Sequence, residues 1–552
     1  MATYNFAVIL KNPRNEAEFL LVKQKRPPQF GDEEYDSFAD SDLWDLPSTR
    51  LNPLEGESEP PISIHDAESC SEMIELRKFD VNLALKRVLE QVVFGDAEWG
   101  NWRFWKFVEE AEFGPGPPFH TLFILGLLVS GDPNLQESCK WMSAQSSLNW
   151  LVDVKPNGDR IGPLVVAGLV NDSLEAKIWK VPQNLNYQEY PPGVTIVPMK
   201  SRTLKPFTTT NLIVFAPESP SADCDDASFV ASGDALIVDP GCHSNLYEEL
   251  KDIVSSLPKK LVVFITHHHH DHVDGLSVVQ QCNPNAVLLA HENTMRRIGK
   301  DVWSLGYTSI TGNEDICIGG QRLNVIFAPF HISITKTCFY IVASGIKQFF
   351  IQGHTDGHMG LLHVRTHSIV VGDHCVGQGS TILDVRSGGN MEDYFKTTYT
   401  FMELSPHALI PMHGRVNLWP KHMLCGYLKN RRSREISILE AIENGAHTLF
   451  EIIANVYSEV DRRFWIPASY NVRLHVDHLA HQDKLPKEFS IQKFQKTCGL
   501  HFFSRWGVEY LTNGFKSKYH KLRTLKLLIA GIVAGFAVLY SAKNKLIFNR
   551  DG

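Results

Sequence analysis

The residues best suited to bind a metal ion lie together at positions 266–275, in the stretch THHHHDHVDG. This stretch follows LVVFI (261–265), an apolar run that predicts a buried strand ending where the histidines begin. Two histidines separated by one residue in extended chain point the same way, so His267 and His269 can hold one ion between them. A lone histidine is usually a surface or core residue, but a run of histidines and aspartates at a strand end predicts a metal site.

Asp271 and His272 follow in the same loop and face a neighbouring position, which predicts a second ion beside the first. Three later motifs supply further ligands of the right chemical type. They are His354 in GHTDGH (353–358), Asp373 in VGD (371–373) and His413 in PMHG (411–414). Each single-histidine motif is a weak signal, whereas all of them in this order make a strong one.

Taken together, these motifs closely resemble the metallo-β-lactamase superfamily, over roughly residues 210–415. The resemblance implies an α/β fold, the αββα metallo-β-lactamase sandwich, whose loops carry two metal ions. Asp239, in LIVDPG, resembles the turn aspartate of the family, which supports the loop and is not a ligand. Matched by motif, the ligands would be His267, His269 and His354 for the first ion, Asp271, His272 and His413 for the second, and Asp373 as the bridge between them.

The resemblance also implies the chemistry. Two divalent ions about 3.5–4 Å apart share a hydroxide whose pKa they lower toward 7, and this hydroxide attacks the substrate. Two zinc ions are expected, with manganese or iron as alternatives for such a ligand set. The sequence leaves open which group protonates the leaving atom. We assign Asp271 as the catalytic residue, and the other candidates are the spare histidines His268, His270, His358 and His374.

Two features narrow the substrate class. The commonest subclass of true β-lactamases has a cysteine at the position of Asp373, so hydrolysis of antibiotics is not expected. Only 39 residues separate Asp373 from His413, too few for the extra domain that marks the RNA-processing and DNA-repair β-CASP branch.

The stretches HGRVNLWPKH and SREISILEAI, which contain or follow His413, resemble the lactamase-beta-like protein 2 branch, which includes an endoribonuclease. This resemblance favours a hydrolase that acts on single-stranded RNA, since a basic C-terminal module suits phosphate binding. A thioester or ester hydrolase of the glyoxalase II kind, acting on a small acyl thioester with the same seven ligands, is the alternative. A membrane-tethered scaffold with a merely structural metal site is the third hypothesis.

One departure from the family pattern concerns residues 330–352. In the family a strand is followed directly by Pro-Gly-His-Thr, whereas here 23 residues separate Pro329 from Gly353. Deleting them restores the family form, FAPGHTDGH. We interpret the segment as an in-frame insertion from a retained intron, with an added hairpin as the alternative. A transcript that lacks codons 330–352 would support the first interpretation, and the position of His354 depends on the outcome.

Length and composition predict about three globular domains in 552 residues with 43% hydrophobic content. Residues 1–205 loosely resemble a Nudix domain, because LWDLP precedes a predicted helix over 80–94. A Nudix box needs several glutamates on this helix, and here only Glu90 stands at such a position. We therefore expect a degenerate α+β Nudix-like domain. The metallo-β-lactamase domain follows over 210–415 and a winged-helix-like helical module over 416–505. The main helix of this module is expected to start at Ser433 and to stop at Asn444-Gly445.

The charge is unevenly distributed along the chain. From residue 415 onward the sequence contains 22 Lys and Arg but only 11 Asp and Glu, although the whole chain has a net charge of −8.

The run LLIAGIVAGFAVLYSA (527–542) carries no charge and has lysines and arginines on both sides. A spanning helix usually needs about 20 apolar residues, and flanking lysines can extend a short one. We therefore expect a C-terminal membrane anchor over 524–545 in a tail-anchored protein that faces the cytosol from an organelle outer membrane, either mitochondrial, plastid or peroxisomal. Gly531 and Gly535 form a GxxxG pair, which hints at self-association in the bilayer.

Overall fold

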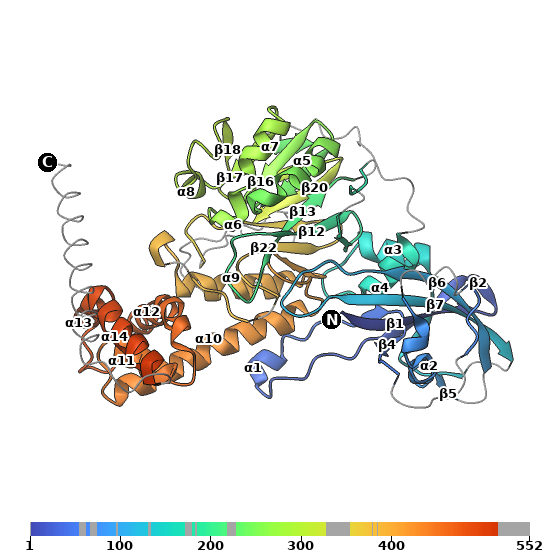
Figure 1. Ribbon diagram of the computed structural model, residues 1–552, viewed down its shortest axis with the longest axis horizontal. Helices are drawn as coiled ribbons and strands as arrows, with labels where there is room; N and C mark the ends of the chain where they lie inside the picture. The colour runs from blue at the N-terminus through green and yellow to red at the C-terminus, as the bar shows by residue number, and fades with distance from the viewer. Residues whose placement is uncertain are drawn as a thin grey trace, which may run out of the picture. The chain divides into compact units, whose positions relative to one another are not determined.

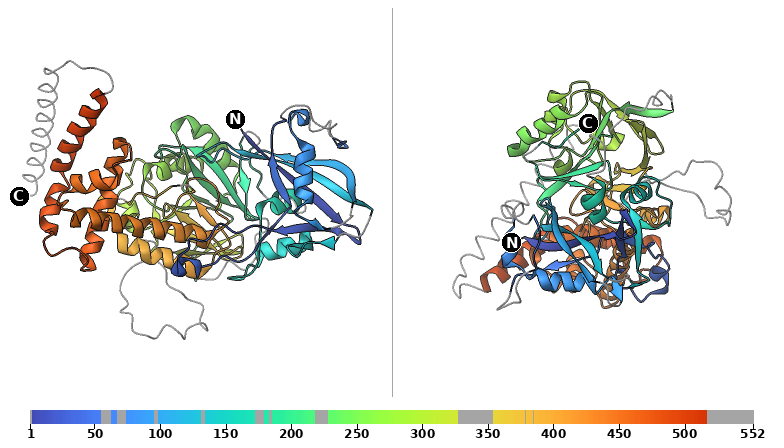
Figure 2. Two further views of the ribbon diagram at one scale, coloured as in Figure 1. Left: turned by 90° about the horizontal axis from the view of Figure 1, so that it is seen from below. Right: turned by 90° about the vertical axis from the view of Figure 1, so that its right-hand side faces the viewer.

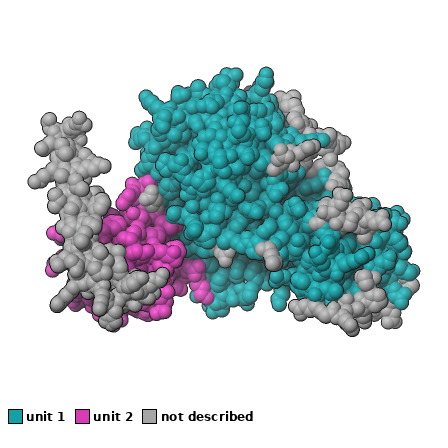
Figure 3. Space-filling view, in the orientation of Figure 1, with its two compact units in different colours: residues 1–381, 393–427 teal, residues 382–392, 428–552 magenta. Residues whose placement is uncertain are grey.

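The computed structural model describes residues 2–54, 62–66, 74–94, 98–130, 134–171, 179–182, 185–217, 228–326, 354–377, 379–383 and 385–516. The chain divides into two compact units. The first contains residues 1–381 with 393–427, and the second contains residues 382–392 with 428–552 (Figure 3).

The N-terminal part of the first unit is a mixed sheet with apolar packing on both faces. Its strand order is β10 (Arg160–Ile161), β3 (Leu43–Asp45), β2 (Asn15–Lys23), β1 (Thr3–Asn12), β7 (Phe119–Ser130) and β6 (Glu98–Val108), with β4 (Ser48–Leu51) on β1 and β9 (Cys139–Ser143) on β2. Val8 and Leu10 of β1 share a core with helix α2 (Val81–Leu89), whereas Ala7 and Ile9 share one with α3 (Ala144–Val152). This alternation is what a strand buried on both faces requires.

The sequence predictions for this part are confirmed in outline. Helix α2 begins where the sequence predicts, because the Asp80 carboxylate accepts the Leu83 N–H at 2.9 Å. The helix ends at Leu89 instead of continuing to residue 94, since β5 (Val93–Phe94) pairs with β8 (Asn134–Leu135). The α+β content therefore agrees with the sequence, while the Nudix likeness stays a prediction.

The strands between residues 188 and 411 form two facing sheets. The first has the order β11 (Gln188–Glu189), β12 (Val194–Lys200), β13 (Thr209–Phe215), β15 (Ala235–Val238), β16 (Leu261–Phe264), β17 (Val287–Ala290) and β18 (Tyr307–Ser309). The second has the order β14 (Phe229–Gly233), β19 (Asp315–Ile318), β20 (Gln321–Ile326), β21 (Gly360–His363), β22 (Ser368–Gly372) and β23 (Leu409–Pro411). Leu236 and Val238 of β15 share a core with residues of the second sheet, such as Val325 and Ile410. The two sheets therefore pack face to face.

Helices cover the outer faces of this sandwich. Leu250 of α5 (Tyr247–Ser256) and Val279 of α7 (Leu276–Cys282) pack with Ala235 and Ile237, the residues of β15 that point away from the second sheet. On the second sheet, α9 (Met391–Leu404) follows β22, and Figures 1 and 2 show α5 and α7 on the opposite side of the sheets from α9. The layers agree with the predicted αββα sandwich.

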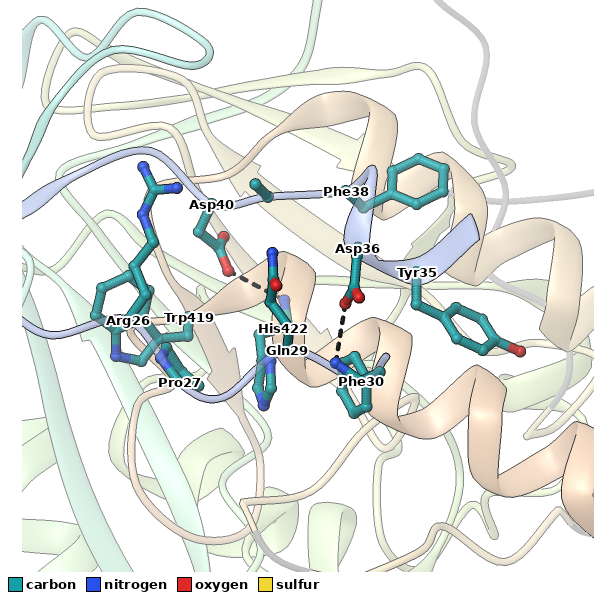
Figure 4. A pocket seen from close by; sticks show the side chains of 11 residues that line it. Arg26, Pro27, Gln29, Phe30, Tyr35, Asp36, Phe38, Asp40, Trp419 and His422 are labelled. Carbon is teal, nitrogen blue, oxygen red and sulfur yellow. Dashed lines mark hydrogen bonds between the residues drawn. The ribbon is translucent and has the colours of Figure 1, made fainter. Parts of the chain in front are cut away.

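Helix α10 (Pro420–Glu443) begins against the N-terminal part of the chain. The Asp40 carboxylate accepts the N–H groups of Lys421 and His422, both at 3.0 Å, and so caps the first turn of the helix. Asp40 and His422 border a pocket in which the Phe30 ring stacks on His422 at 4.6 Å between ring centroids (Figure 4). The helix start predicted at Ser433 is wrong, because the distant Asp40 caps the chain at Pro420 instead.

The regular secondary structure in the described part of the second unit is entirely helical. Beside the C-terminal half of α10 it contains α11 (Leu449–Val456), α12 (Trp465–His481), α13 (Ile491–Thr497) and α14 (Leu500–Lys516). Thr448 caps α11 with a full capping box, and the stop predicted at Gly445 is confirmed by its φ of +93°. No strand lies among residues 428–516, so the helical character agrees with the sequence and the winged-helix comparison stays a prediction.

The predicted membrane anchor must be corrected. In the part of the chain that the structure describes, no helix combines the length and the apolar composition needed to cross a bilayer. The longest helix, α10, carries charged side chains along its whole length. The span predicted at 524–545, with its Gly531 and Gly535 pair, lies outside the described residues. We therefore retain neither the anchor nor the tail-anchored location.

A buried charge cluster joins α10 to α12 within the second unit. Glu435 Oε1 lies 2.6 Å from His478 Nδ1 and 3.2 Å from His475 Nδ1. Burial lowers the pKa of His475 to about 4, although the contact with Glu435 opposes this. Burial would raise the pKa of Glu435, but the two histidine contacts lower it to about 2.

This cluster predicts that the second unit loses stability in acid. The unfolded chain protonates His475 near pH 6.5, whereas the folded unit does so only near pH 4, so the free energy of unfolding falls as the pH drops through this window. Glu435 acts in the same direction below about pH 4.5. We expect a loss on the order of 3 kcal/mol from His475, measured by pulsed hydrogen exchange of α12 peptides in urea at each pH.

The His475→Gln variant should lose most of this pH dependence between pH 6.5 and 4. His481→Gln is the matched control, because His481 lies on the same helix outside the charge cluster, and it should keep the slope of the parent. Equal slopes in His475→Gln and the parent protein would contradict the explanation.

Candidate metal centre

Both sheets deliver polar residues to the same end of the sandwich. β15 is followed by Asp239, β16 by the histidine-rich loop, β22 by Asp373, and β23 by His413 two residues later. Strands that run into polar loops at one sheet edge are the usual location of chemistry in α/β folds. The four predicted segments are therefore brought together by the topology.

The histidine-rich loop turns into α6 (His270–Val273), a single turn that places Asp271 and His272 beside His267 and His269. The turn packs closely on the 239–241 loop, since a Cβ atom on Gly241 would overlap the Asp271 carbonyl. Only glycine fits at this close approach of two backbones.

Three histidine nitrogens converge at the first site. His267 Nε2 and His269 Nδ1 are 2.9 Å apart, and His354 Nε2 lies 3.3 Å and 3.2 Å from them. Asp373 Oδ2 lies 3.8 Å from His354 Nε2 and completes the set. These are the four residues that the family resemblance assigns to the first ion and to the bridge.

The second site shares Asp373 with the first. His413 Nε2 lies 3.4 Å from Asp271 Oδ2 and 3.4 Å from Asp373 Oδ1. His272 Nε2 lies 3.7 Å from Asp271 Oδ1 and 3.7 Å from Asp373 Oδ1. Asp373 thus directs one oxygen toward each group of histidines, as a bridging carboxylate does.

The chemistry of these donors fits metal ions. Ligand atoms that surround an ion tetrahedrally at about 2.0–2.1 Å are themselves about 3.3–3.4 Å apart, close to the separations measured here. His272 Nε2 and Asp373 Oδ1 are buried without a hydrogen-bond partner among the described residues. Buried polar atoms need a partner, and a cation between the two groups would satisfy both. The seven predicted residues therefore form one site that suits two ions.

The outer nitrogens of the same histidines are held by hydrogen bonds. His272 Nδ1 lies 2.7 Å from Asp239 Oδ2, and His413 Nδ1 donates to the Thr209 carbonyl at 2.8 Å. Asp239 also accepts the N–H and hydroxyl of Thr266. Such contacts fix the ring orientation and leave Nε2 facing the site. The sequence motif pointed to Asp239, whereas a backbone carbonyl such as that of Thr209 carries no sequence signal.

The charges of the site balance one another in the absence of an ion. Burial alone would lower the pKa of His413, but Asp373 and Asp271 raise it to about 9. The same carboxylates raise the pKa of His272 against the effect of burial, while burial holds the pKa of His267 well below its usual range. Metal binding must therefore displace protons from His272 and His413.

The spare histidines occupy different places. His270 is exposed and pairs with Asp274 at 3.2 Å, and His268 is half-buried outside the two groups. His374 is buried, with Nε2 2.9 Å from Thr398 Oγ1 and its ring 4.4 Å from that of Tyr394. Of these candidates for protonating the leaving atom, His270 and His374 are committed to contacts outside the ligand set.

His358 has a supporting position. Its Nε2 accepts the backbone N–H of Asp373 at 3.0 Å, which fixes the chain at the bridging carboxylate. Gly372 has a φ of +56°, and a Cβ atom there would overlap His358 Nε2, so the turn into Asp373 requires glycine.

Sequence reasoning missed two neighbours of His413 in the loop between β12 and β13. Thr203 Oγ1 lies 3.5 Å from His413 Nε2, and the Phe207 ring centroid lies 5.7 Å from that of His413. The loop stretch SRTLKPF has no motif that would have identified it. Only the pairing of β12 with β13 brings it beside the site.

Comparison with known protein families gives one assignment. Residues 226–413 match the model of the Metallo-beta-lactamase superfamily, and this stretch contains all seven converging residues. Residues 226–413 therefore belong to the metallo-β-lactamase superfamily. The chain is accordingly a metal-dependent hydrolase. The matched residues contain both His/Asp groups described above.

Named relatives divide between two kinds of protein. A Drosophila melanogaster protein named "Beta-lactamase-like protein 2 homolog" is 24% identical over 230 residues, which are 40% of this chain and 69% of the fly protein. A Prochlorococcus marinus "Hydroxyacylglutathione hydrolase" is 31% identical over 116 residues, 21% of this chain and 42% of that enzyme. Among solved structures, a beta-lactamase domain protein from Burkholderia ambifaria aligns with a TM-score of 0.41 and 16% identity, covering 57% of this chain and 95% of its own.

The segment 330–352 lies outside the described residues, so its origin stays a prediction. His354, which comes directly after Gly353, nevertheless lies within hydrogen-bonding distance of His267 and His269. The structure therefore places His354 in the site, where the sequence alone left its position open.

Metal analysis tests the centre directly. We expect about two ions per chain of the full-length protein by elemental analysis, falling to one or fewer in His267→Ala, because three of the first site's ligand atoms lie within 3.3 Å of one another. His270→Ala is the control, since its ring is exposed and pairs with Asp274 outside the ligand set, and it should keep both ions. Two ions in the His267→Ala variant would refute this ligand set.

Proposed function

We propose that this chain is a dinuclear hydrolase that cleaves phosphodiester bonds of single-stranded RNA. The observation that supports the proposal is the convergence of His267, His269, His354, Asp373, Asp271, His272 and His413 into two groups that share Asp373. Two zinc ions are the proposed cofactor, with manganese or iron as the alternatives that the same ligands accept.

The residues of the chain have separable roles in this proposal. When bound, the two ions supply a hydroxide nucleophile at neutral pH and polarise a substrate oxygen. The pKa of Asp271 is held well below its usual range, since His272 and His413 outweigh its burial, so the carboxylate stays ionised. Its two oxygens face His272 and His413, from where it can accept a hydrogen from the attacking water and orient it. Asp271 is therefore the proposed catalytic residue.

An anionic substrate suits the surroundings of the second site. The loop that contacts His413 through Thr203 exposes Lys205 and Arg202, the latter paired with Asp274 at 3.1 Å. Positive charge beside a metal site attracts phosphate groups and raises the local concentration of an anionic substrate. The match to a "Beta-lactamase-like protein 2 homolog", which covers 69% of that protein, agrees with the branch resemblance from which the RNA proposal comes.

The second candidate is a thioester hydrolase that acts on an acyl-glutathione. It is favoured by the 31% identity to a hydroxyacylglutathione hydrolase over 116 residues. This identity is higher than the 24% to the fly protein, although the match is shorter. Glutathione conjugates are also anionic, so Arg202 and Lys205 suit both substrates.

The flanking domains complete the proposal. We infer that residues 1–205 are a degenerate Nudix-like domain with a structural role, residues 210–415 the catalytic domain, and residues 416–505 a helical module of the winged-helix kind. The mixed sheet around β1 and the helices α10 to α13 support this division.

Activity assays separate the two substrates. With a metal-loaded protein we expect cleavage of a labelled single-stranded RNA, and a loss of about 10³-fold in kcat/KM for Asp271→Ala, since that carboxylate faces the reacting water. His270→Ala should keep the parent's rate. Hydrolysis of a hydroxyacyl-glutathione thioester without RNA cleavage, again lost in Asp271→Ala, would establish the second candidate instead. A protein that binds two ions and hydrolyses neither substrate would contradict both.

A further inference from the structure

The loop that carries His354 is bound to the chain around α8 (Glu292–Met295). Arg297, two residues after this helix, donates from its two terminal nitrogens to the two carboxylate oxygens of Asp356, at 2.6 Å and 2.9 Å. Two parallel hydrogen bonds between a guanidinium and a carboxylate fix orientation as well as distance. Asp356 follows His354 by two residues, so the pair holds the chain at most about 7 Å along the backbone from that ligand.

Side chains of the same helix reinforce this pair by hydrogen bonds to the backbone of the loop. The hydroxyl of Thr294, which is fully buried, donates to the Gly357 carbonyl at 2.9 Å, and the Asn293 amide donates to the Asp356 carbonyl at 3.3 Å. A Cβ atom on Gly357 would lie 2.7 Å from Thr294 Oγ1, so the loop lies directly against the helix.

Further along the chain the loop is tied to the metal site itself. The Met359 N–H donates to the Thr266 carbonyl at 2.8 Å, next to His267, and His358 accepts the N–H of Asp373. All of these contacts lie on the C-terminal side of His354. These contacts hold the chain directly after His354, over residues 356–359.

We propose that Arg297 is a positioning residue for the first metal site, acting through Asp356 to hold His354 in place. The inference rests on the proposed function only in taking His354 as a metal ligand. Both partners are about one third exposed, with side-chain exposures of 30% and 31%, so the pair contributes little to global stability. Its effect should appear in metal affinity, because partners beyond the ligands typically change affinity by about 10–100-fold.

The test uses the full chain, stripped of metal and titrated with Zn²⁺ against a chromophoric chelator. Arg297→Gln should weaken binding of the ion at the first site by about tenfold and change the visible spectrum of the cobalt-substituted protein. Arg296→Gln is the matched control, since Arg296 pairs with Glu292 on the surface of the same helical segment, and it should bind like the parent. The double variant Arg297→Asp/Asp356→Arg restores the pair in reverse and should recover most of the affinity.

Thermal unfolding of the metal-free variants shows whether an affinity change comes from misfolding. If Arg297→Gln unfolds, Asp356→Asn provides the same test with a smaller change of shape. Parent-like affinity and spectrum in a folded Arg297→Gln variant would overturn the inference and leave the proposed function intact. A parent chain that binds no zinc would instead remove the basis of both.

Discussion

Buried charge at one end of the sandwich is the constraint on which the rest of the structure depends. Asp271 and Asp373 are largely buried carboxylates that remain ionised, and removing an ion from water costs several kcal/mol unless an opposite charge compensates it. Without metal the compensation comes from His272 and His413, whose pKa values are raised by these carboxylates. With metal the ions take over this role. Ions bound at these residues would take the place of the protons on His272 and His413.

Such a site needs a rigid backbone, and the turns around it have fixed conformations. Asp239 adopts a φ of +49°, in the left-handed region that aspartate tolerates better than most residues, and from there it reaches both Thr266 and His272. Gly372 adopts a φ of +56° directly before Asp373. Both turns lie at strand ends, so the sheets fix the start of each loop and the unusual dihedral angle directs the carboxylate.

The sequence identified the converging residues because their chemistry is local. Histidine and aspartate at fixed spacings after an apolar run indicate metal binding whatever surrounds them, and all seven predicted residues meet in the structure. The strands of the sandwich were also predictable, since runs such as LVVFI and DALIV are short, apolar and bounded by turns. The features that the sequence could not show depend on distant partners. Asp40 sets the start of α10 from the far N-terminal part of the chain, and no local pattern around Ser433 reveals it.

Similar long-range contacts join the N-terminal domain to the strand that leads to this centre. Arg415, two residues after His413, forms two hydrogen bonds with Glu110 at 2.6 Å and 2.9 Å. At the other end of β23, the buried Tyr190 hydroxyl lies 2.8 Å from His407 Nε2, and Arg160 binds the Leu418 carbonyl. The strand that leads to His413 is thus held at both ends by residues of the N-terminal domain, none of which resembles a catalytic motif. The N-terminal domain can therefore contribute to this centre through packing alone, because it holds the strand that positions His413.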